Sequence, residues 1–264
     1  MPAVLLSPAV ITPLPKPLLR LLTQNCCLLP TYIFQSVGLD NREQRAMLIS
    51  QMIQRYDIVL LQEVFGTAWC GEWRKVFTST PNMQSVMGIK AKCKILDSGL
   101  VILSRYPIID SSFIQFRSKS LSNAIIDRGF LYAEIKVGEK RVHVINTHLN
   151  PDETHYGIHS PAEYRRRQLQ EILRFKKKAE GEKSKGEWVI GGDFNDDKLS
   201  EALRPMIVSN VTEATSHKRV SYAIDDGTQS YCIDYLATSR PQQYARVVHN
   251  LISDHYGVEA GMVL

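Results

Sequence analysis

Short apolar runs recur along the chain, separated by turn-forming or charged residues, and this pattern predicts a protein rich in β-strands. Residues 130–137 and 141–147 flank Gly138, an arrangement typical of a β-hairpin. Further strands are expected at residues 18–26, 57–62, 99–103, 188–191, 233–238 and 257–262.

Two other segments place apolar residues at helical spacing, and we expect helices at residues 42–55 and 162–179. Few helices among many strands do not follow the regular strand–helix alternation of a Rossmann fold or a (β/α)₈ barrel. The pattern favours two sheets that pack together and are flanked by helices.

The composition fits a folded domain. The chain has 264 residues, of which 44% are hydrophobic and 22% are charged, so it can bury a substantial core. This excludes a disordered chain and a collagen-like fibre. No apolar run reaches the length of a transmembrane helix. We expect one domain over residues 18–264, preceded by a proline-rich lead-in over residues 1–17.

The N-terminus and the cysteines bear on the compartment. Four prolines interrupt the apolar residues 3–22, and no positive charge precedes them, so a lead-in is favoured over a secretory signal peptide. The five cysteines are odd in number and show no CxxC spacing. This argues against a disulfide framework or a structural zinc site and favours a reducing compartment, so we expect a cytoplasmic protein.

Polar residues with useful chemistry lie at or just beyond the ends of the apolar strands, where α/β proteins gather their sites. Carboxylate and amide oxygens suit Mg²⁺, whereas zinc would require more histidine or cysteine. Each residue also has a structural interpretation, as a turn former, a helix cap or a hydrogen-bonded histidine, so only the ordered set indicates function. The set is Asn25, Glu63, Asn146, His148, Asp193, Asn195, Asp234, Asp254 and His255.

Seven segments in order carry a resemblance to a known family. TQNCCLLP, LLQEVF, SGLVILSRYPI, NTHLNP, GGDFND, CIDYL and SDHYGV resemble the motifs of the endonuclease/exonuclease/phosphatase superfamily, over roughly residues 20–260. The resemblance implies a DNase I-like fold, a four-layer α/β sandwich of two packed mixed β-sheets flanked by helices. It also implies a single catalytic domain that hydrolyses a phosphoester by direct attack of water with a divalent metal.

The resemblance assigns a role to each residue of the set. Mg²⁺, with Mn²⁺ as the alternative, would be bound by Glu63 and Asn25, with Asp254 near the metal. His255 would act as general base, oriented by Asp234. His148 would donate to a phosphate oxygen, and the phosphate and the attacking water would be positioned by Asp193 and Asn195.

The substrate branch is indicated by two further segments. LDSGLVILSRYPI followed by DRGFLYAEI is most similar to the neutral sphingomyelinase branch, in which lysine usually stands at the position of Arg128. This change keeps the charge but replaces a point charge with a planar fork, and we expect Arg128 to bind the substrate. The tyrosine that the abasic-site endonuclease branch usually carries is replaced by His148, and the P-x-W-x-D-R segment of inositol polyphosphate 5-phosphatases is absent.

These features favour a sphingomyelinase-like phosphodiesterase that acts on a phospholipid head group. A nuclease or a nucleotide phosphodiesterase of the same superfamily is the alternative. A catalytically silent binding module is the remote alternative, against which the intact set of polar residues argues. No obligate protein partner is evident.

A basic segment offers a second contact with the substrate. The formal net charge of +5 is too small to identify a nucleic-acid binder, but residues 164–178 concentrate basic side chains. This segment is interpreted either as a solvated helix face or as a peripheral contact with anionic lipid or a nucleic-acid backbone. In the superfamily an arginine of this region often points into the site, so we include Arg165 and Arg166 among the expected substrate contacts.

Overall fold

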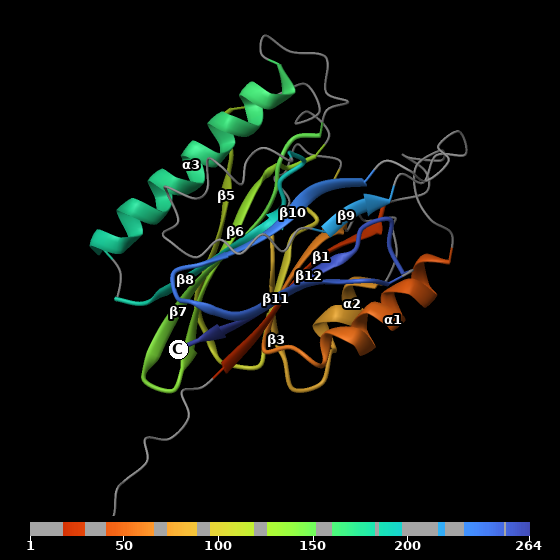
Figure 1. The fold of residues 1–264 in the computed structure, drawn as a ribbon, viewed down its shortest axis with the longest axis horizontal. Coiled ribbons are helices and arrows are strands. Elements are labelled where there is room, and N and C mark those ends of the chain that lie inside the picture. The colour runs from red at the N-terminus through yellow and green to blue at the C-terminus, as the bar shows by residue number, and fades with distance from the viewer. Residues whose placement is uncertain are drawn as a thin grey trace, which may run out of the picture.

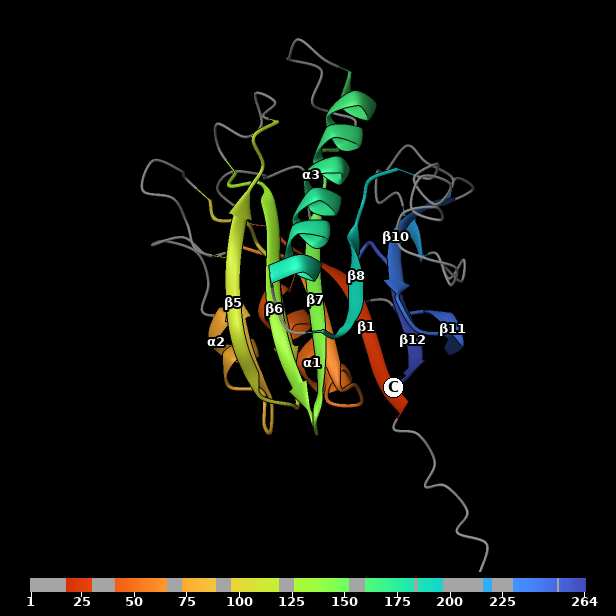
Figure 2. The same ribbon diagram turned by 90° about the vertical axis from the view of Figure 1, so that its left-hand side faces the viewer.

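Two six-stranded sheets pack face to face, with helices on both outer sides (Figures 1 and 2). The computed structural model describes residues 18–29, 41–65, 73–88, 96–118, 126–151, 160–182, 185–196, 216–219, 230–250 and 252–264. The lead-in expected at residues 1–17 lies outside this described part. The layers run helix, sheet, sheet, helix, which confirms the predicted four-layer α/β sandwich.

The first sheet has the strand order β11-β12-β1-β2-β4-β3. Strands β1 and β2 are parallel, and the remaining pairs are antiparallel. Its strands are β1 (Leu18–Leu28), β2 (Ile58–Val64), β3 (Gln84–Met87), β4 (Val101–Ser104), β11 (Gln242–Val248) and β12 (Gly257–Val263). Its outer face is covered by α1 (Arg42–Ile53) and α2 (Trp73–Thr78).

The second sheet has the strand order β5-β6-β7-β8-β10-β9. Strands β7 and β8 are parallel, and β6 and β7 form the predicted hairpin, with Val137 paired to Lys140 beside the turn. Its strands are β5 (Ile108–Gln115), β6 (Gly129–Val137), β7 (Lys140–His148), β8 (Glu187–Asp193), β9 (Ser216–Arg219) and β10 (Ser230–Thr238). Helix α3 (Pro161–Glu182) lies along its outer face (Figure 2).

Every strand and helix expected from the apolar pattern is present, with its ends shifted by a few residues. The pattern did not predict β3, β5, β9, β11 or α2. Strand β5 is an edge strand, and the side chains in its first half are mostly exposed, so it carries no apolar run. Strand β11 is also an edge strand with half-buried side chains. Edge strands have less surface to bury, so their sequences lack the signal that identifies central strands.

The main core lies between the sheets. The apolar side chains of β1 and β2 pack against those of β7 and β8, including Leu21, Leu60, Val144 and Val189, all fully buried. The two parallel pairs therefore face each other, and the carboxyl ends of all four strands lie at one end of the sandwich. None of the described helices is both long and apolar enough to cross a membrane.

Candidate active site

Side chains from both sheets meet at the carboxyl ends of the four central strands. Asn25 of β1 donates through Nδ2 to Glu63 Oε1 on β2, at 3.2 Å, and to Asp193 Oδ2 on β8, at 3.0 Å. His148 ends β7 and pairs with Asp193 in the parallel register. The apolar strands before these residues are buried, so the sandwich core fixes the positions of the polar strand ends. The expected gathering of polar strand ends is observed.

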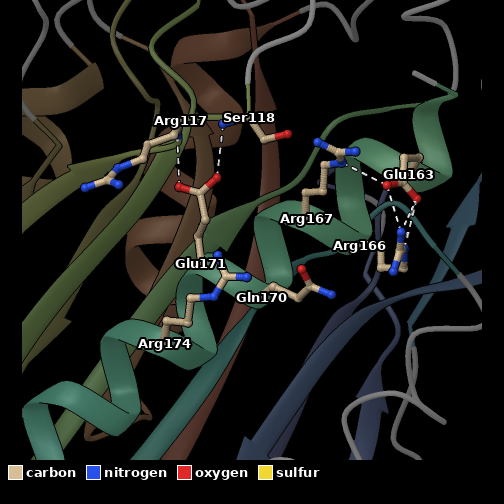
Figure 3. A pocket seen from close by; sticks show the side chains of 8 residues that line it. All are labelled: Arg117, Ser118, Glu163, Arg166, Arg167, Gln170, Glu171 and Arg174. Carbon is tan, nitrogen blue, oxygen red and sulfur yellow. Dashed lines mark hydrogen bonds and ion pairs between the residues drawn. The ribbon is translucent and has the colours of Figure 1, made fainter. Parts of the chain in front are cut away.

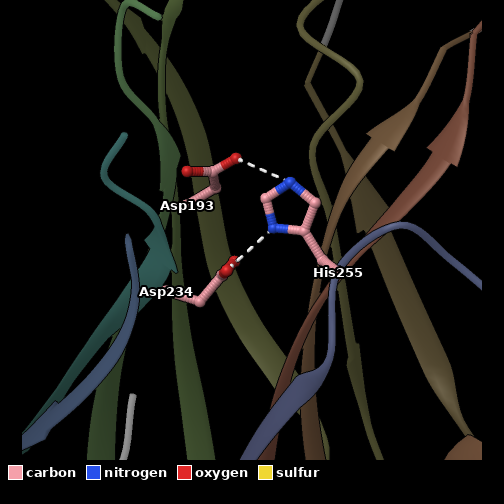
Figure 4. A group of neighbouring side chains, drawn as sticks. All are labelled: Asp193, Asp234 and His255. Atoms are coloured by element: carbon pink, nitrogen blue, oxygen red, sulfur yellow. Dashed lines mark hydrogen bonds and ion pairs between the residues drawn. The ribbon is translucent and has the colours of Figure 1, made fainter. Parts of the chain in front are cut away.

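His255 lies between two carboxylates (Figure 4). Its Nδ1 is 2.8 Å from Asp234 Oδ2, and its Nε2 is 3.8 Å from Asp193 Oδ2. His148 approaches Asp193 as well, with Nε2 at 3.5 Å from Oδ2. His255 is only 2% exposed. An imidazole with one nitrogen bound to a buried carboxylate and the other facing the site has the geometry of a general base.

The two carboxylates determine the basicity of His255. Burial alone would lower the pKa of His255, but the negative charges of Asp234 and Asp193 and the hydrogen bond to Asp234 outweigh it and raise the pKa to about 10. The pair therefore stabilises the imidazolium that forms when His255 accepts a proton.

Glu63 belongs to a region with an excess of negative charge. Burial and the nearby carboxylate of Asp254 raise the pKa of Glu63 to about 7, and Asp193 adds to the effect. Asp254 is half-buried and accepts from Ser253 Oγ at 3.3 Å. Several carboxylates gathered in a buried place favour the binding of a cation, and an oxygen-rich set of donors suits a hard divalent ion.

A second grouping could also hold a metal ion. One ligand atom each from Asp193, Asp234 and His255 lies within 4.8 Å of the others. In the group of Asp193, Asp234 and His255, the Nδ1 atom of His255 is already engaged in a hydrogen bond with Asp234. The carboxylate oxygens of Glu63 and Asp254 carry negative charge that a cation would balance. The donor chemistry therefore favours the Glu63 side of the site.

Three backbone positions near the site are conformationally strained. Glu63, Asn195 and Cys27 have φ values of 57°, 51° and 50°, in the left-handed region that side chains with a Cβ disfavour. Such residues gather at functional sites, where the surrounding structure holds them in place. Asn195 is held through its backbone N–H, which donates to Asp193 Oδ1 at 2.8 Å, and through Nδ2, which donates to the carbonyl of Leu149 at 3.0 Å.

Supporting residues that the sequence did not single out hold the end of β1 against the segment before β12. Gln24 Nε2 donates to the carbonyl of His255 at 3.0 Å, and Ser253 Oγ donates to the carbonyl of Asn25 at 2.6 Å. Arg45 of α1 is 6% exposed and donates to the carbonyls of Cys26, Cys27 and Ile252. Gln24 and Ser253 could have been found, since they belong to the TQNCCLLP and SDHYGV motifs, whereas Arg45 belongs to none of the seven segments.

Arg128 lies at the site, as expected. It is 7% exposed, and its Nη1 donates to the carbonyls of His148 and Leu149. Its Nε is buried and has no hydrogen-bond partner among the residues that the structure describes. Burial lowers its pKa to about 10, against the effect of Glu63 and Asp193, whose carboxylates favour the charged form. A cation with an unused donor beside the carboxylates is suited to a phosphate oxygen.

Three other expected residues lie elsewhere. Arg165 is buried in an ion pair with Asp196, Nε to Oδ2 at 3.1 Å, and its Nη1 donates to the carbonyl of Asn150 just beyond β7. Arg166 pairs with Glu163 on the exposed side of α3, and the structure does not bring it to His255. Asn146 is fully buried between the sheets. It donates to the carbonyls of Leu61 and Val101 and accepts from Gln62, so its contacts are structural.

Comparison with known proteins agrees with this geometry. The family described as "Endonuclease/Exonuclease/phosphatase family" matches residues 34–255. A sphingomyelinase C of Bacillus cereus is 27% identical over 271 residues, which cover 89% of this chain and 79% of that protein.

Solved structures with the same fold are similar over nearly their whole length. A form of beta toxin from Staphylococcus aureus has a TM-score of 0.77 at 25% identity, covering 92% of this chain and 99% of that chain. A variant of beta toxin from the same organism, solved with bound magnesium ions, has a TM-score of 0.75 at 24% identity, covering 92% of this chain and 98% of that chain.

Proposed function

This chain belongs to the endonuclease/exonuclease/phosphatase family and is a phosphoester hydrolase, and we propose that it is a Mg²⁺-dependent phosphodiesterase that cleaves sphingomyelin or a closely related phospholipid. The similarity to sphingomyelinase C over 89% of the chain carries the proposal. The absence of the abasic-site endonuclease and 5-phosphatase motifs supports it against the two other branches of the family. The site supports it with a buried histidine–aspartate pair beside Arg128, whose Nε has no hydrogen-bond partner in the described part of the chain.

The residues at the Glu63 side fit a divalent cation. Glu63, Asn25 and Asp254 would hold it, since they offer carboxylate and amide oxygens. Burial and the negative charge of Asp254 raise the pKa of Glu63, and a bound cation would offset both effects. When bound, Mg²⁺ supplies positive charge that neutralises the substrate phosphate and brings the pKa of His255 closer to its ordinary value.

Hydrolysis in this site begins with water. His255 Nε2 faces the site and accepts the proton of the attacking water, while Asp234 holds Nδ1 and stabilises the imidazolium. The water oxygen bonds to phosphorus, the bond from phosphorus to the lipid alcohol breaks, and the alcohol oxygen takes up a proton from solvent water, to which the His255 imidazolium then releases the proton that it accepted. Arg128 Nε and His148 donate to the phosphate oxygens, and Asp193 and Asn195 hold the water and phosphate in position.

The test compares sphingomyelin vesicles and plasmid DNA as substrates of the purified protein, in Mg²⁺ and in EDTA. We expect Mg²⁺-dependent release of phosphocholine with DNA intact. His255→Ala should lower turnover by about 10² to 10⁴-fold without loss of the fold, while Glu139→Gln, at an exposed turn, should act as wild type. Nicked DNA with intact lipid would contradict the substrate assignment, and full activity of His255→Ala would contradict the general base.

A further inference from the structure

A groove in which four of the eight lining residues are arginine lies between α3 and the segment that follows β5 (Figure 3). Its cavity is about 400 Å³, and Glu163, Arg166, Arg167, Gln170, Glu171 and Arg174 of α3 face Arg117 and Ser118 across it. From this groove we infer a binding site for the head group of an acidic phospholipid, separate from the hydrolytic site.

Both carboxylates of the groove are already engaged. Glu163 accepts from Arg166 Nη2 at 2.6 Å and from Arg167 Nε at 2.8 Å. Glu171 accepts from the backbone N–H groups of Arg117 and Ser118, at 2.9 and 3.0 Å, and so fixes the end of β5 to α3. Neither acid neutralises the guanidinium groups of Arg117 and Arg174.

Those two guanidinium groups are exposed, and within the part of the chain that the structure describes neither forms an ion pair. With four arginines against two glutamates, the groove holds a net positive charge. Guanidinium groups bind phosphate oxygens through two parallel hydrogen bonds, so a phosphate diester is the anion that the pair matches best.

An apolar surface adjoins the arginines. A second cavity, of about 250 Å³, shares Arg117, Glu171 and Arg174 with the first and has Ile114 and Phe175 among its lining residues. Lys178 lies at its far side. A cationic rim beside an apolar surface matches a lipid, whose phosphate adjoins methylene groups. A nucleic acid matches this surface less well, since base stacking needs an open ring face. Phe130, which also lines the cavity, is 1% exposed, and the half-buried ring of Phe175 already packs against the rings of Phe130 and Tyr132.

The groove begins at the end of the second sheet where the candidate site lies. Arg117 follows the end of β5, where Gln115 pairs with Gly129, and the next residue, Phe130, pairs with Thr147 beside His148. Helix α3 begins at the same end, because Arg165 in its first turns donates to the carbonyl of Asn150 just beyond β7. A membrane bound at the groove therefore lies close to the end of the molecule that carries His148 and Asp193.

The test measures binding without catalysis, so that it is independent of the proposed function. The full chain is mixed in EDTA with vesicles of phosphatidylcholine alone, or of phosphatidylcholine and phosphatidylglycerol in equal amounts, and bound protein is measured by cosedimentation. We expect binding to the acidic vesicles only. The double variant Arg117→Gln/Arg174→Gln should bind them about 25-fold more weakly, since each cation near an anionic surface contributes about fivefold.

The matched control is Arg55→Gln/Lys140→Gln, which removes the same charge from exposed residues at the opposite end of the sandwich and should bind as wild type. Thermal unfolding verifies that both double variants are folded. Equal binding of wild type and Arg117→Gln/Arg174→Gln would overturn the inference, as would equal loss in the control. Binding to plasmid DNA that depends on Arg117 and Arg174, without vesicle binding, would also overturn it in favour of a nucleic-acid site.

Discussion

Asp234 acts only through the imidazole ring of His255, to which it is hydrogen-bonded. Its carboxylate is fully buried, and Oδ2 lies 2.8 Å from Nδ1 of His255. Asp234→Asn keeps the size of the side chain but removes the charge that raises the pKa of His255. We expect kcat to fall by about 10² to 10⁴-fold, as for general bases that lose their orienting acid.

The pH dependence gives a second readout of the same variant. A base is active when deprotonated, so activity rises with pH through the pKa of His255. Removing the Asp234 charge lowers that pKa, and the rise in kcat should therefore move to lower pH in Asp234→Asn while the plateau falls. A purely structural defect would lower kcat without moving the profile, and an unmoved profile would contradict the assigned role.

At the residue scale, the sequence could predict the reacting groups better than their supports. His148, Asp193 and Asp234 end or interrupt apolar strands and His255 lies just before one, so their positions stand out along the chain. Arg45 does not, because a single arginine in a helix looks like any solvated side chain. Arg45 donates to the carbonyl of Ile252, which is more than 200 residues away in the sequence. Such a contact depends on how the chain folds and leaves no local signal.

Arg165 and Arg166 illustrate the same limit. They are adjacent in a basic run, and the sequence offers no means of separating them. The α-helix turns neighbouring side chains by about 100°, so one becomes buried against Asp196 and the other stays on the surface with Glu163. Their roles toward a substrate stay predictions.

At the scale of elements, the approach of β8 to β7 depends on Gly192. A Cβ at this position would lie 1.9 Å from the carbonyl oxygen of Thr147, and its φ of 140° disfavours any side chain. Gly192→Ala should therefore push apart the two strands that carry His148 and Asp193. We expect a loss of about 3 kcal/mol or more in the free energy of unfolding, measured by urea denaturation, together with loss of activity.

A glycine in open space provides the control. Gly181 lies in α3, and a Cβ there would meet nothing within 4 Å. Gly181→Ala should leave activity unchanged and raise the free energy of unfolding by up to about 1 kcal/mol, because alanine favours the helix. Equal stability of the Gly192→Ala and Gly181→Ala proteins would show that the strands can separate without cost, contrary to the prediction.

The central strands could be predicted because they are buried on both faces and read as continuous apolar runs, as Ile58–Val64 does. The edge strands and the pairing order could not, since they depend on which strands meet in space. The groove of α3 was equally hidden, because the side opposite the helix is formed by residues 117 and 118, which follow the unpredicted strand β5.

At the scale of the whole molecule, the candidate site joins the two sheets. Asn25 and Glu63 come from the first sheet, Asp193 and Asp234 from the second, and Asn25 donates across the interface. A cation bound by Glu63, Asn25 and Asp254 would stabilise the native state as a whole, because the unfolded chain does not assemble these ligands. The preference for Mg²⁺ stays a proposal that measurements in solution can decide. The cytoplasmic location expected from the cysteines also stays a proposal.

Mg²⁺ should therefore raise the melting temperature of the wild-type protein relative to EDTA. A ligand at a concentration 100-fold above its Kd adds about 2.7 kcal/mol, which for a chain of this size corresponds to roughly 5–10 °C. Glu63→Gln removes a carboxylate from the proposed cation site and should abolish most of this shift, whereas Glu139→Gln at an exposed turn should retain it.

Because Glu63 is buried among other carboxylates, its variant should also melt higher than wild type in EDTA, which separates loss of the cation from loss of the fold. A shift that survives in Glu63→Gln and vanishes in Asp234→Asn would instead place the cation among Asp193, Asp234 and His255, where three ligand atoms also lie close together. The same melting temperature in Mg²⁺ and EDTA would contradict both positions.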